Sequence, residues 1–72
     1  MITGAQIRAA RALLQWSTPV LAKHCGVTAA KLRWAESFNS IPNLDASEII
    51  AIEKALSAGG VEFSDQSGAK AE

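Results

Sequence analysis

Few side chains in this sequence could take part in covalent or metal chemistry. His24 and Cys25 are its one histidine and its one cysteine, and they are adjacent in the chain. Neighbouring residues on a helix point about 100° apart, so these two side chains would not converge on one atom. A zinc site needs further ligands of the same kind, and a catalytic nucleophile needs a nearby base. We therefore expect no metal, no cofactor and no enzyme activity.

A second group of side chains could contact the edges of base pairs. Leu32 and Ala35 are spaced to turn inward on a helix, which leaves an outer face of Ala29, Ala30, Arg33, Trp34 and Ser37. Arg33 suits a bidentate contact to guanine, worth about 1–3 kcal/mol of discrimination, and the alanines suit thymine methyl groups. Two roles stay open for Trp34: contact with a sugar or thymine methyl group, and contact with a protein partner. The base-reading candidates are Ala29, Ala30, Arg33 and Trp34.

Polar side chains around this segment could bind phosphate groups. Such contacts position a protein on DNA without specifying a sequence. Backbone amides at the start of a helix after Ser17 would add to them, because helix N-termini favour anions. The phosphate-binding candidates are Thr18, Lys23, Lys31, Ser37, Asn39 and Ser40.

Two short helices joined by a tight turn would position these side chains. Ser17 can cap a helix that extends to about Cys25, and Thr28 can cap a second helix that extends to about Ser37. Gly26 lies between them, where glycine adopts a positive φ at no steric cost. This spacing predicts a helix-turn-helix, whose second helix is shaped to enter the major groove of DNA. The alternative is an ordinary helical hairpin. The apolar residues spaced to meet inside the corner are Leu21, Ala22, Cys25, Val27, Leu32 and Ala35.

One further helix is expected on each side of this pair. Thr3 and Gln6 have the spacing of a capping box before a helix from about Gly4 to Gln15. Asp45 and Glu48 have the same spacing before a helix that extends to about Ala58. The fold class we expect is therefore all-α, with four helices in one domain over residues 1–63.

The end of the chain differs in character. Val61 and Phe63 flank Glu62 in an alternating segment that predicts a short strand, and the chain offers no second strand to pair with it. We expect this segment to pair with its copy in a homodimer, or to pack as an extended tail on the preceding helix. Residues 64–72 are polar and aperiodic, which predicts a disordered tail. The candidate dimer-interface residues are Ile50, Val61 and Phe63.

Length and charge limit the classes of function. Seventy-two residues make one small domain with a small core. The net charge is zero, but residues 1–36 carry five basic side chains against Glu36, and residues 37–72 carry six acidic side chains against Lys54 and Lys70. The positive half could still face phosphates. With one cysteine, no signal-peptide pattern and no long apolar stretch, we expect a cytoplasmic protein that does not cross a membrane.

Residues 4–60 resemble the lambda-repressor-like DNA-binding domain of the Xre family. This resemblance implies a transcriptional regulator, such as a repressor or an autoregulated control protein of a mobile element, and a homodimer that binds an inverted repeat of double-stranded DNA. It also implies a structural ion pair between Arg11 and Glu36. The matching residues are Ile7, Arg11 and Leu14, then Leu21 and Ala22, then Gly26, Val27 and Thr28, then Leu32 and Glu36, and finally Ile41 and Pro42.

Three positions depart from the family pattern. The family usually has glutamine where this chain has Thr18, and often glycine where this chain has bulky Phe38. The usual fifth helix is replaced by the segment 61–63. These departures, the exposed Trp34 and the zero net charge keep a second function open, namely a protein-interaction module on the same fold, such as an antitoxin or antiactivator.

Overall fold

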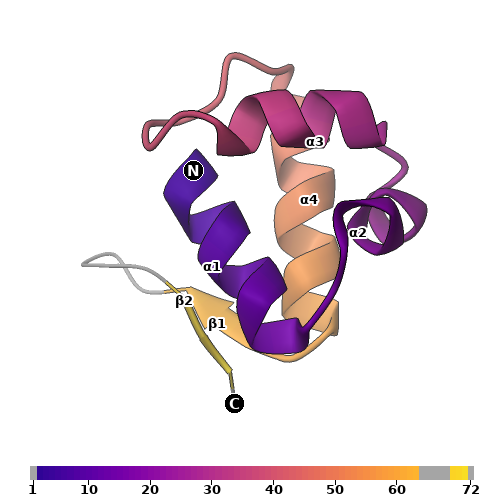
Figure 1. Ribbon diagram of the computed structural model, residues 1–72, viewed down its shortest axis with the longest axis vertical. Coiled ribbons are helices and arrows are strands. Elements are labelled where there is room, and N and C mark those ends of the chain that lie inside the picture. The colour runs from indigo at the N-terminus through magenta and orange to yellow at the C-terminus, as the bar shows by residue number, and fades with distance from the viewer. Residues whose placement is uncertain (1, 64–68, 72) are drawn as a thin grey trace.

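The computed structural model describes residues 2–63 and 69–71 and shows a small, mostly helical domain with four helices. The helices are α1 (Gly4–Leu14), α2 (Thr18–Cys25), α3 (Ala29–Glu36) and α4 (Ala46–Ala58). Figure 1 shows α1 and α4 side by side, with α3 lying across their upper ends. The chain therefore presents α3 along one end of the domain.

The predicted capping box at the start of α1 is confirmed. The Thr3 hydroxyl accepts a hydrogen bond from the Gln6 amide at 3.1 Å, and the Gln6 side chain accepts one from the Thr3 amide at 2.9 Å. The helix ends one residue earlier than expected, because Gln15 adopts the left-handed conformation with φ of 57°. This residue turns the chain toward α2.

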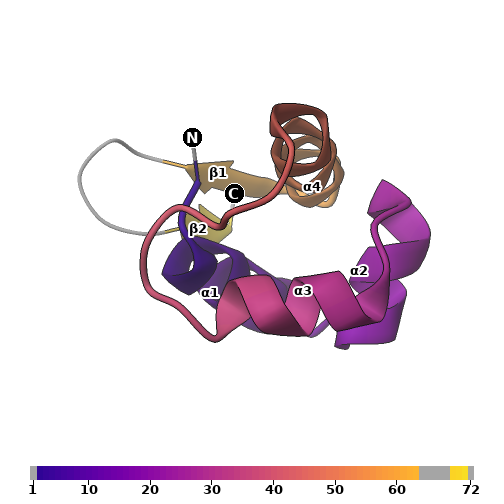
Figure 2. The same cartoon turned by 90° about the horizontal axis from the view of Figure 1, so that it is seen from above.

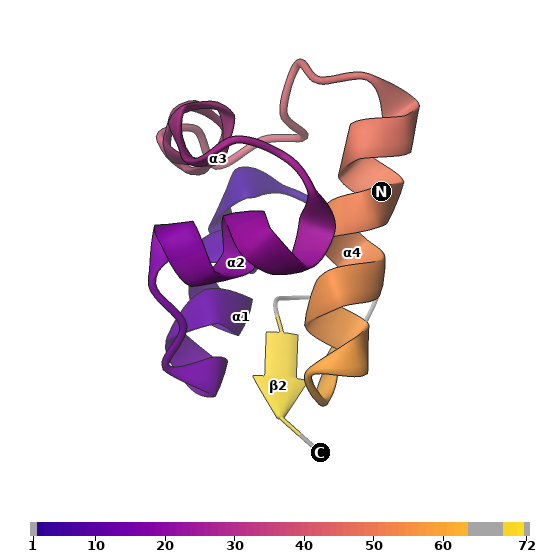
Figure 3. The same ribbon diagram turned by 90° about the vertical axis from the view of Figure 1, so that its right-hand side faces the viewer.

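The predicted pair of short helices is also observed. Ser17 caps α2 through the Val20 amide, and Thr28 caps α3 through the Lys31 amide. Gly26 has a φ of 77°, in the left-handed region that glycine adopts without strain. Figure 3 looks along the axis of α3 and shows α2 lying across the view. The two helices therefore form a corner, as the sequence predicts.

Five side chains with no exposed surface form the centre of the core, and every helix contributes. Burying an aliphatic side chain of this size contributes about 1.5–3 kcal/mol each before the entropy of folding is subtracted. Ala10 and Ala35 are also buried, and their small side chains allow α1 and α3 to approach closely. Trp16 is half-buried against this core and stacks on His24, with ring centroids 4.4 Å apart. The five central residues are Ile7, Leu21, Leu32, Ile52 and Leu56.

The segment between α3 and α4 passes the start of α1 on its way back across the domain (Figure 2). The Gly4 amide donates a hydrogen bond to the Ser40 carbonyl at 2.9 Å. A Cβ atom on Gly4 would collide with the carbonyl oxygens of Phe38 and Ala35. Glycine at this position therefore lets the start of α1 touch the end of α3.

The C-terminal part of the chain corrects one expectation. Strand β1 (Val61–Phe63) pairs antiparallel with β2 (Ala69–Ala71), with Val61 opposite Ala71. The chain does contain a second strand, so β1 needs no copy of itself for pairing, and residues 69–71 are not part of a disordered tail. The rest of that expected tail, residues 64–68 and 72, lies outside the described residues.

In the part of the chain that the structure describes, no helix is both long enough and apolar enough to cross a lipid bilayer.

Candidate nucleic-acid interface

The outer face of α3 carries the predicted base-reading side chains. Ala30, Arg33 and Trp34 are exposed and Ala29 is half-buried, whereas Leu32 and Ala35 are buried beneath them. Among the described residues, the Arg33 side chain makes no hydrogen bond or ion pair, so its guanidinium is available to a ligand. Helical spacing alone therefore separates the inner and outer faces of α3 correctly.

Ser37 is exposed at the end of α3, but its hydroxyl group is engaged. The hydroxyl donates a hydrogen bond of 2.6 Å to the Trp34 carbonyl. Ser37 can therefore still accept a hydrogen bond, but it has no free proton to donate to a phosphate or a base. This hydrogen bond therefore reduces the number of free hydrogen-bond donors on the outer face of α3.

The ion pair between Arg11 and Glu36 is observed. The Arg11 Nη2 atom lies 2.7 Å from Glu36 Oε1, and its Nε atom lies 3.1 Å from Oε2. Glu36 is 7% exposed, and Arg11 also donates to the Trp16 carbonyl at 2.9 Å. The hydrogen bond with Glu36, helped by its charge, raises the pKa of Arg11 against the opposing effect of partial burial. Arg11 thus joins α1 to Glu36 at the end of α3 and to the turn that leads to α2.

Arg8 adds a second link between α1 and the end of α3, which the sequence analysis did not predict. Its Nη1 atom donates to the Glu36 carbonyl, and its Nη2 atom donates to Asn39 Oδ1 at 2.8 Å. Carbonyl groups at the end of a helix lack partners and favour a cation. The spacing of Arg8 and Arg11, three residues apart on one side of α1, is the signal that could have identified this link.

Lys31 does not stand free as a phosphate ligand. Its Nζ atom lies 2.8 Å from Glu48 Oε2, so it joins α3 to the first turn of α4. The hydrogen bond and charge of Glu48 raise the pKa of Lys31, and the hydrogen bond from Lys31 lowers the pKa of Glu48. Glu48 also accepts from the Asp45 amide in the predicted capping box. Contact with a phosphate would require Lys31 to leave this pair.

The other phosphate-binding candidates are distributed over two regions. Asn39 and Ser40 are exposed just after α3, with Asn39 oriented by Arg8. Thr18 is half-buried at the start of α2, and Lys23 is exposed in its last turn. The structure therefore brings Asn39 and Ser40 together beside the outer face of α3 and holds Thr18 and Lys23 on the neighbouring helix.

The dimer-interface candidates do not form one surface. Ile50 is 47% exposed on α4, whereas Val61 is 3% exposed and Phe63 packs against the core. Val61 therefore belongs to the core of one chain. An interface with a second copy could use Ile50 and the exposed part of Phe63, but not Val61.

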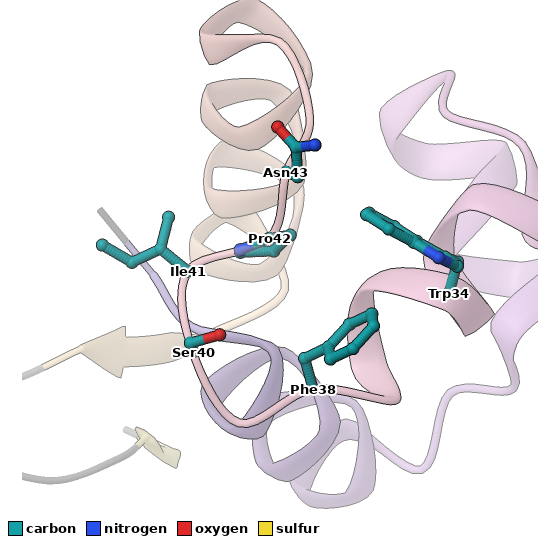
Figure 4. A pocket seen from close by; sticks show the side chains of 6 residues that line it. All are labelled: Trp34, Phe38, Ser40, Ile41, Pro42 and Asn43. Atoms are coloured by element: carbon teal, nitrogen blue, oxygen red, sulfur yellow. The ribbon is translucent and has the colours of Figure 1, made fainter.

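A shallow apolar pocket lies next to the outer face of α3 and was not predicted. Its volume is about 220 Å³. The Trp34 and Phe38 rings line one side and meet edge to face, with centroids 5.2 Å apart and planes at 72°. Figure 4 shows both rings turned toward the loop at Pro42 and Asn43, whereas Ile41 points away from them. Two aromatic residues spaced four apart were the sequence signal for it. The lining residues are Trp34, Phe38, Ser40, Ile41, Pro42 and Asn43.

The outer face of α3 and the loop after it expose one guanidinium without a partner among the described residues, together with apolar side chains and scattered amides and hydroxyls. In the described ranges, no three His, Cys, Asp or Glu side chains gather as a metal site. Comparison with protein-family models, with curated protein sequences and with solved structures found no match for this chain.

Proposed function

We propose that this chain is a sequence-specific DNA-binding protein that regulates transcription, with α3 in the major groove of double-stranded DNA. The observation that carries the proposal is the corner formed by α2 and α3. Capped helices of eight residues each meet at Gly26, and the second presents an exposed outer face with a free arginine. A protruding helix of this kind matches the width of the major groove.

The distribution of charge supports the same function. Every exposed charged side chain on α2 and α3 is basic, namely Lys23, Lys31 and Arg33, because Glu36 is buried under Arg11. Glu48 of α4 compensates Lys31, so Lys23 and Arg33 are the two basic side chains of α2 and α3 without an ion pair among the described residues. Phosphate groups would be attracted to the α2–α3 side, and this attraction would weaken as salt is added.

The regulatory role and the oligomeric state belong to the same proposal. The chain resembles lambda-repressor-like regulators of the Xre family, which fits a repressor or an autoregulated control protein of a mobile element. One copy offers a single strong hydrogen-bonding reader, Arg33, so two copies on an inverted repeat would be needed for tight specific binding. Light scattering during size exclusion is expected to give a dimer, and a strict monomer at high concentration would contradict this part.

The test is a titration with DNA from the promoter region of the chain's own gene at two salt concentrations. We expect one preferred site, an affinity that falls steeply with salt, and a loss of about 1–3 kcal/mol for Arg33→Ala. The matched control is Lys54→Ala, which removes the positive charge of an exposed side chain on α4. It should leave the preference for one DNA site unchanged. Absence of any preferred site for the unaltered chain would refute the proposal.

A second candidate function is a protein-interaction module without direct DNA reading. The observation that favours it is the apolar pocket, since Trp34, Phe38 and Ile41 are 45%, 47% and 53% exposed. Exposed aromatic side chains are typical of protein-binding sites. This candidate becomes the better one if the chain prefers no DNA site and Arg33→Ala changes nothing in the titration.

A further inference from the structure

Three side chains form an apolar line on the outer face of α3. Ala30, Trp34 and Phe38 follow each other at intervals of four residues, which places them one above the other on a helix. Phe38 comes just after the helix ends, where Ser37 keeps right-handed helical angles and continues the spacing. Trp34 and Phe38 are each exposed by nearly half of their surface and touch edge to face.

Two polar side chains beside this line are already engaged. The Ser37 hydroxyl donates to the Trp34 carbonyl, and the Lys31 ammonium is paired with Glu48. Among the described residues, Arg33 keeps a free guanidinium and the Trp34 indole N–H makes no hydrogen bond, so this face offers few polar contacts beside its apolar side chains.

The occupant follows from what the major groove offers. The C5-methyl group of thymine is the apolar feature that base-pair edges display there. The basic residues Arg33 and Lys23 are exposed on the same two helices, so the surroundings of the line complement the phosphates that flank such a methyl group. The shallow hollow between the two rings and Pro42 can admit a group of that size.

We propose that the line Ala30–Trp34–Phe38 contacts the C5-methyl groups of thymines, and that thymine selection is the main source of sequence preference beyond the Arg33 contact. This inference rests on the proposed function, since it needs α3 in the major groove. It assigns Trp34 and Phe38 to thymine specificity beside the Arg33 contact to guanine, and leaves orientation to the phosphate contacts.

The experiment changes the DNA rather than the protein, so that folding is not at issue. Sites are first selected with the unaltered chain from a library of random-sequence duplexes. Each thymine of the selected site is then replaced in turn by deoxyuridine, which lacks only the methyl group. We expect thymine-rich positions in the selected site and a loss of about fourfold in affinity for each methyl group contacted, as for burial of one methylene-sized group.

Protein variants link the effect to the line. Trp34→Ala and Phe38→Ala should remove the difference between thymine and deoxyuridine at the positions they contact. Leu13→Ala is the matched control, because Leu13 is 44% exposed and belongs to the last turn of α1. Figure 1 shows that this end of α1 lies away from α3. The control variant should retain the full difference.

Three other outcomes would overturn the inference, and they are distinguishable. Selected sites bound equally well with deoxyuridine would refute thymine selection while leaving the proposed function intact. A deoxyuridine effect that persists unchanged in both Trp34→Ala and Phe38→Ala would assign the contact to other residues. No enrichment of any duplex would refute both proposals and leave the apolar line as a surface for a protein partner.

Discussion

Glu36 is an acidic residue whose role is set by the side chains around it. It is the one acidic side chain in the basic half of the chain, yet it is buried and its carboxylate is held by Arg11 at 2.7 Å. Arg8 binds its carbonyl group at the same time. The residue therefore fixes the end of α3 against α1, and Arg11 compensates its negative charge.

Removing Arg11 should cost more stability than removing any exposed charge. Arg11→Ala leaves the Glu36 carboxylate buried without a partner, and we expect a loss of about 3 kcal/mol in the free energy of unfolding, the low end for a buried pair because Arg11 is partly exposed. Urea denaturation measures the loss. The double variant Arg11→Met with Glu36→Leu should recover much of it, and Lys31→Ala, which breaks an exposed pair, should cost clearly less. Equal losses for Arg11→Ala and Lys31→Ala would contradict this account.

The Lys31–Glu48 pair should make stability depend on pH in a defined direction. Because the folded chain lowers the pKa of Glu48, the pair stabilises above the ordinary glutamate pKa of about 4.3, and this contribution is lost as pH falls through the lowered value. Because the pKa of Lys31 is raised, the contribution is also lost as pH rises through that raised value, above about 10.4.

The measurement compares the urea midpoint of the unaltered chain with that of Glu48→Gln, which keeps the capping box. We expect Glu48→Gln to be less stable at neutral pH and the difference to close in acid. Glu53→Gln is the control on the same helix, since Glu53 makes no ion pair among the described residues. A difference that stays constant from neutral to acidic pH would show that the pair is not the cause.

At the level of helices, the position of α3 depends on a close backbone approach. Gly4 at the start of α1 has no room for a Cβ atom, because the carbonyl oxygens of Ala35 and Phe38 occupy that space. Its amide donates to the Ser40 carbonyl. The end of α3 and the loop that carries Asn39 and Ser40 are thus set by backbone contacts with α1.

Gly4→Ala should therefore destabilise the chain, although alanine is the better helix former. We expect a loss of about 1–3 kcal/mol, typical of overpacking, measured by thermal or urea unfolding. Gly59→Ala is the comparison. Its Cβ atom would meet the side-chain ends of Leu14 and Trp16 at 2.9 Å, and because side chains can move, its loss of stability should be smaller. The explanation fails if Gly4→Ala is as stable as the unaltered chain.

At the scale of the whole molecule, the acidic residues that the structure describes, apart from Glu36, lie outside α2 and α3. The two helices of the corner carry the exposed basic residues Lys23, Lys31 and Arg33, whereas Glu48 and Glu53 lie on α4 and Glu62 on β1. The acidic part supplies Glu48, which holds α3 in place through Lys31. Zero net charge is therefore compatible with one surface that attracts phosphates and another that repels them.

The sequence by itself determined the four helices and their inner faces. Capping residues such as Thr3, Ser17 and Thr28 and the glycine at 26 act locally, so their effects can be read without knowing the rest of the fold. The spacing of Leu32 and Ala35 likewise assigned the buried side of α3. Helix ends were predicted to within about one residue for this reason.

Only the tertiary structure decided which side chains remain free. Four contacts bring together residues that are distant along the chain. Val61–Phe63 pairs with Ala69–Ala71, and Lys31 pairs with Glu48. Arg8 binds Asn39, and the carbonyl groups at the end of α3 leave no room for a side chain at Gly4. Such contacts depend on how the helices are placed in space, which periodicity does not specify. They are the reason that the outer face of α3 carries one free arginine beside an apolar line.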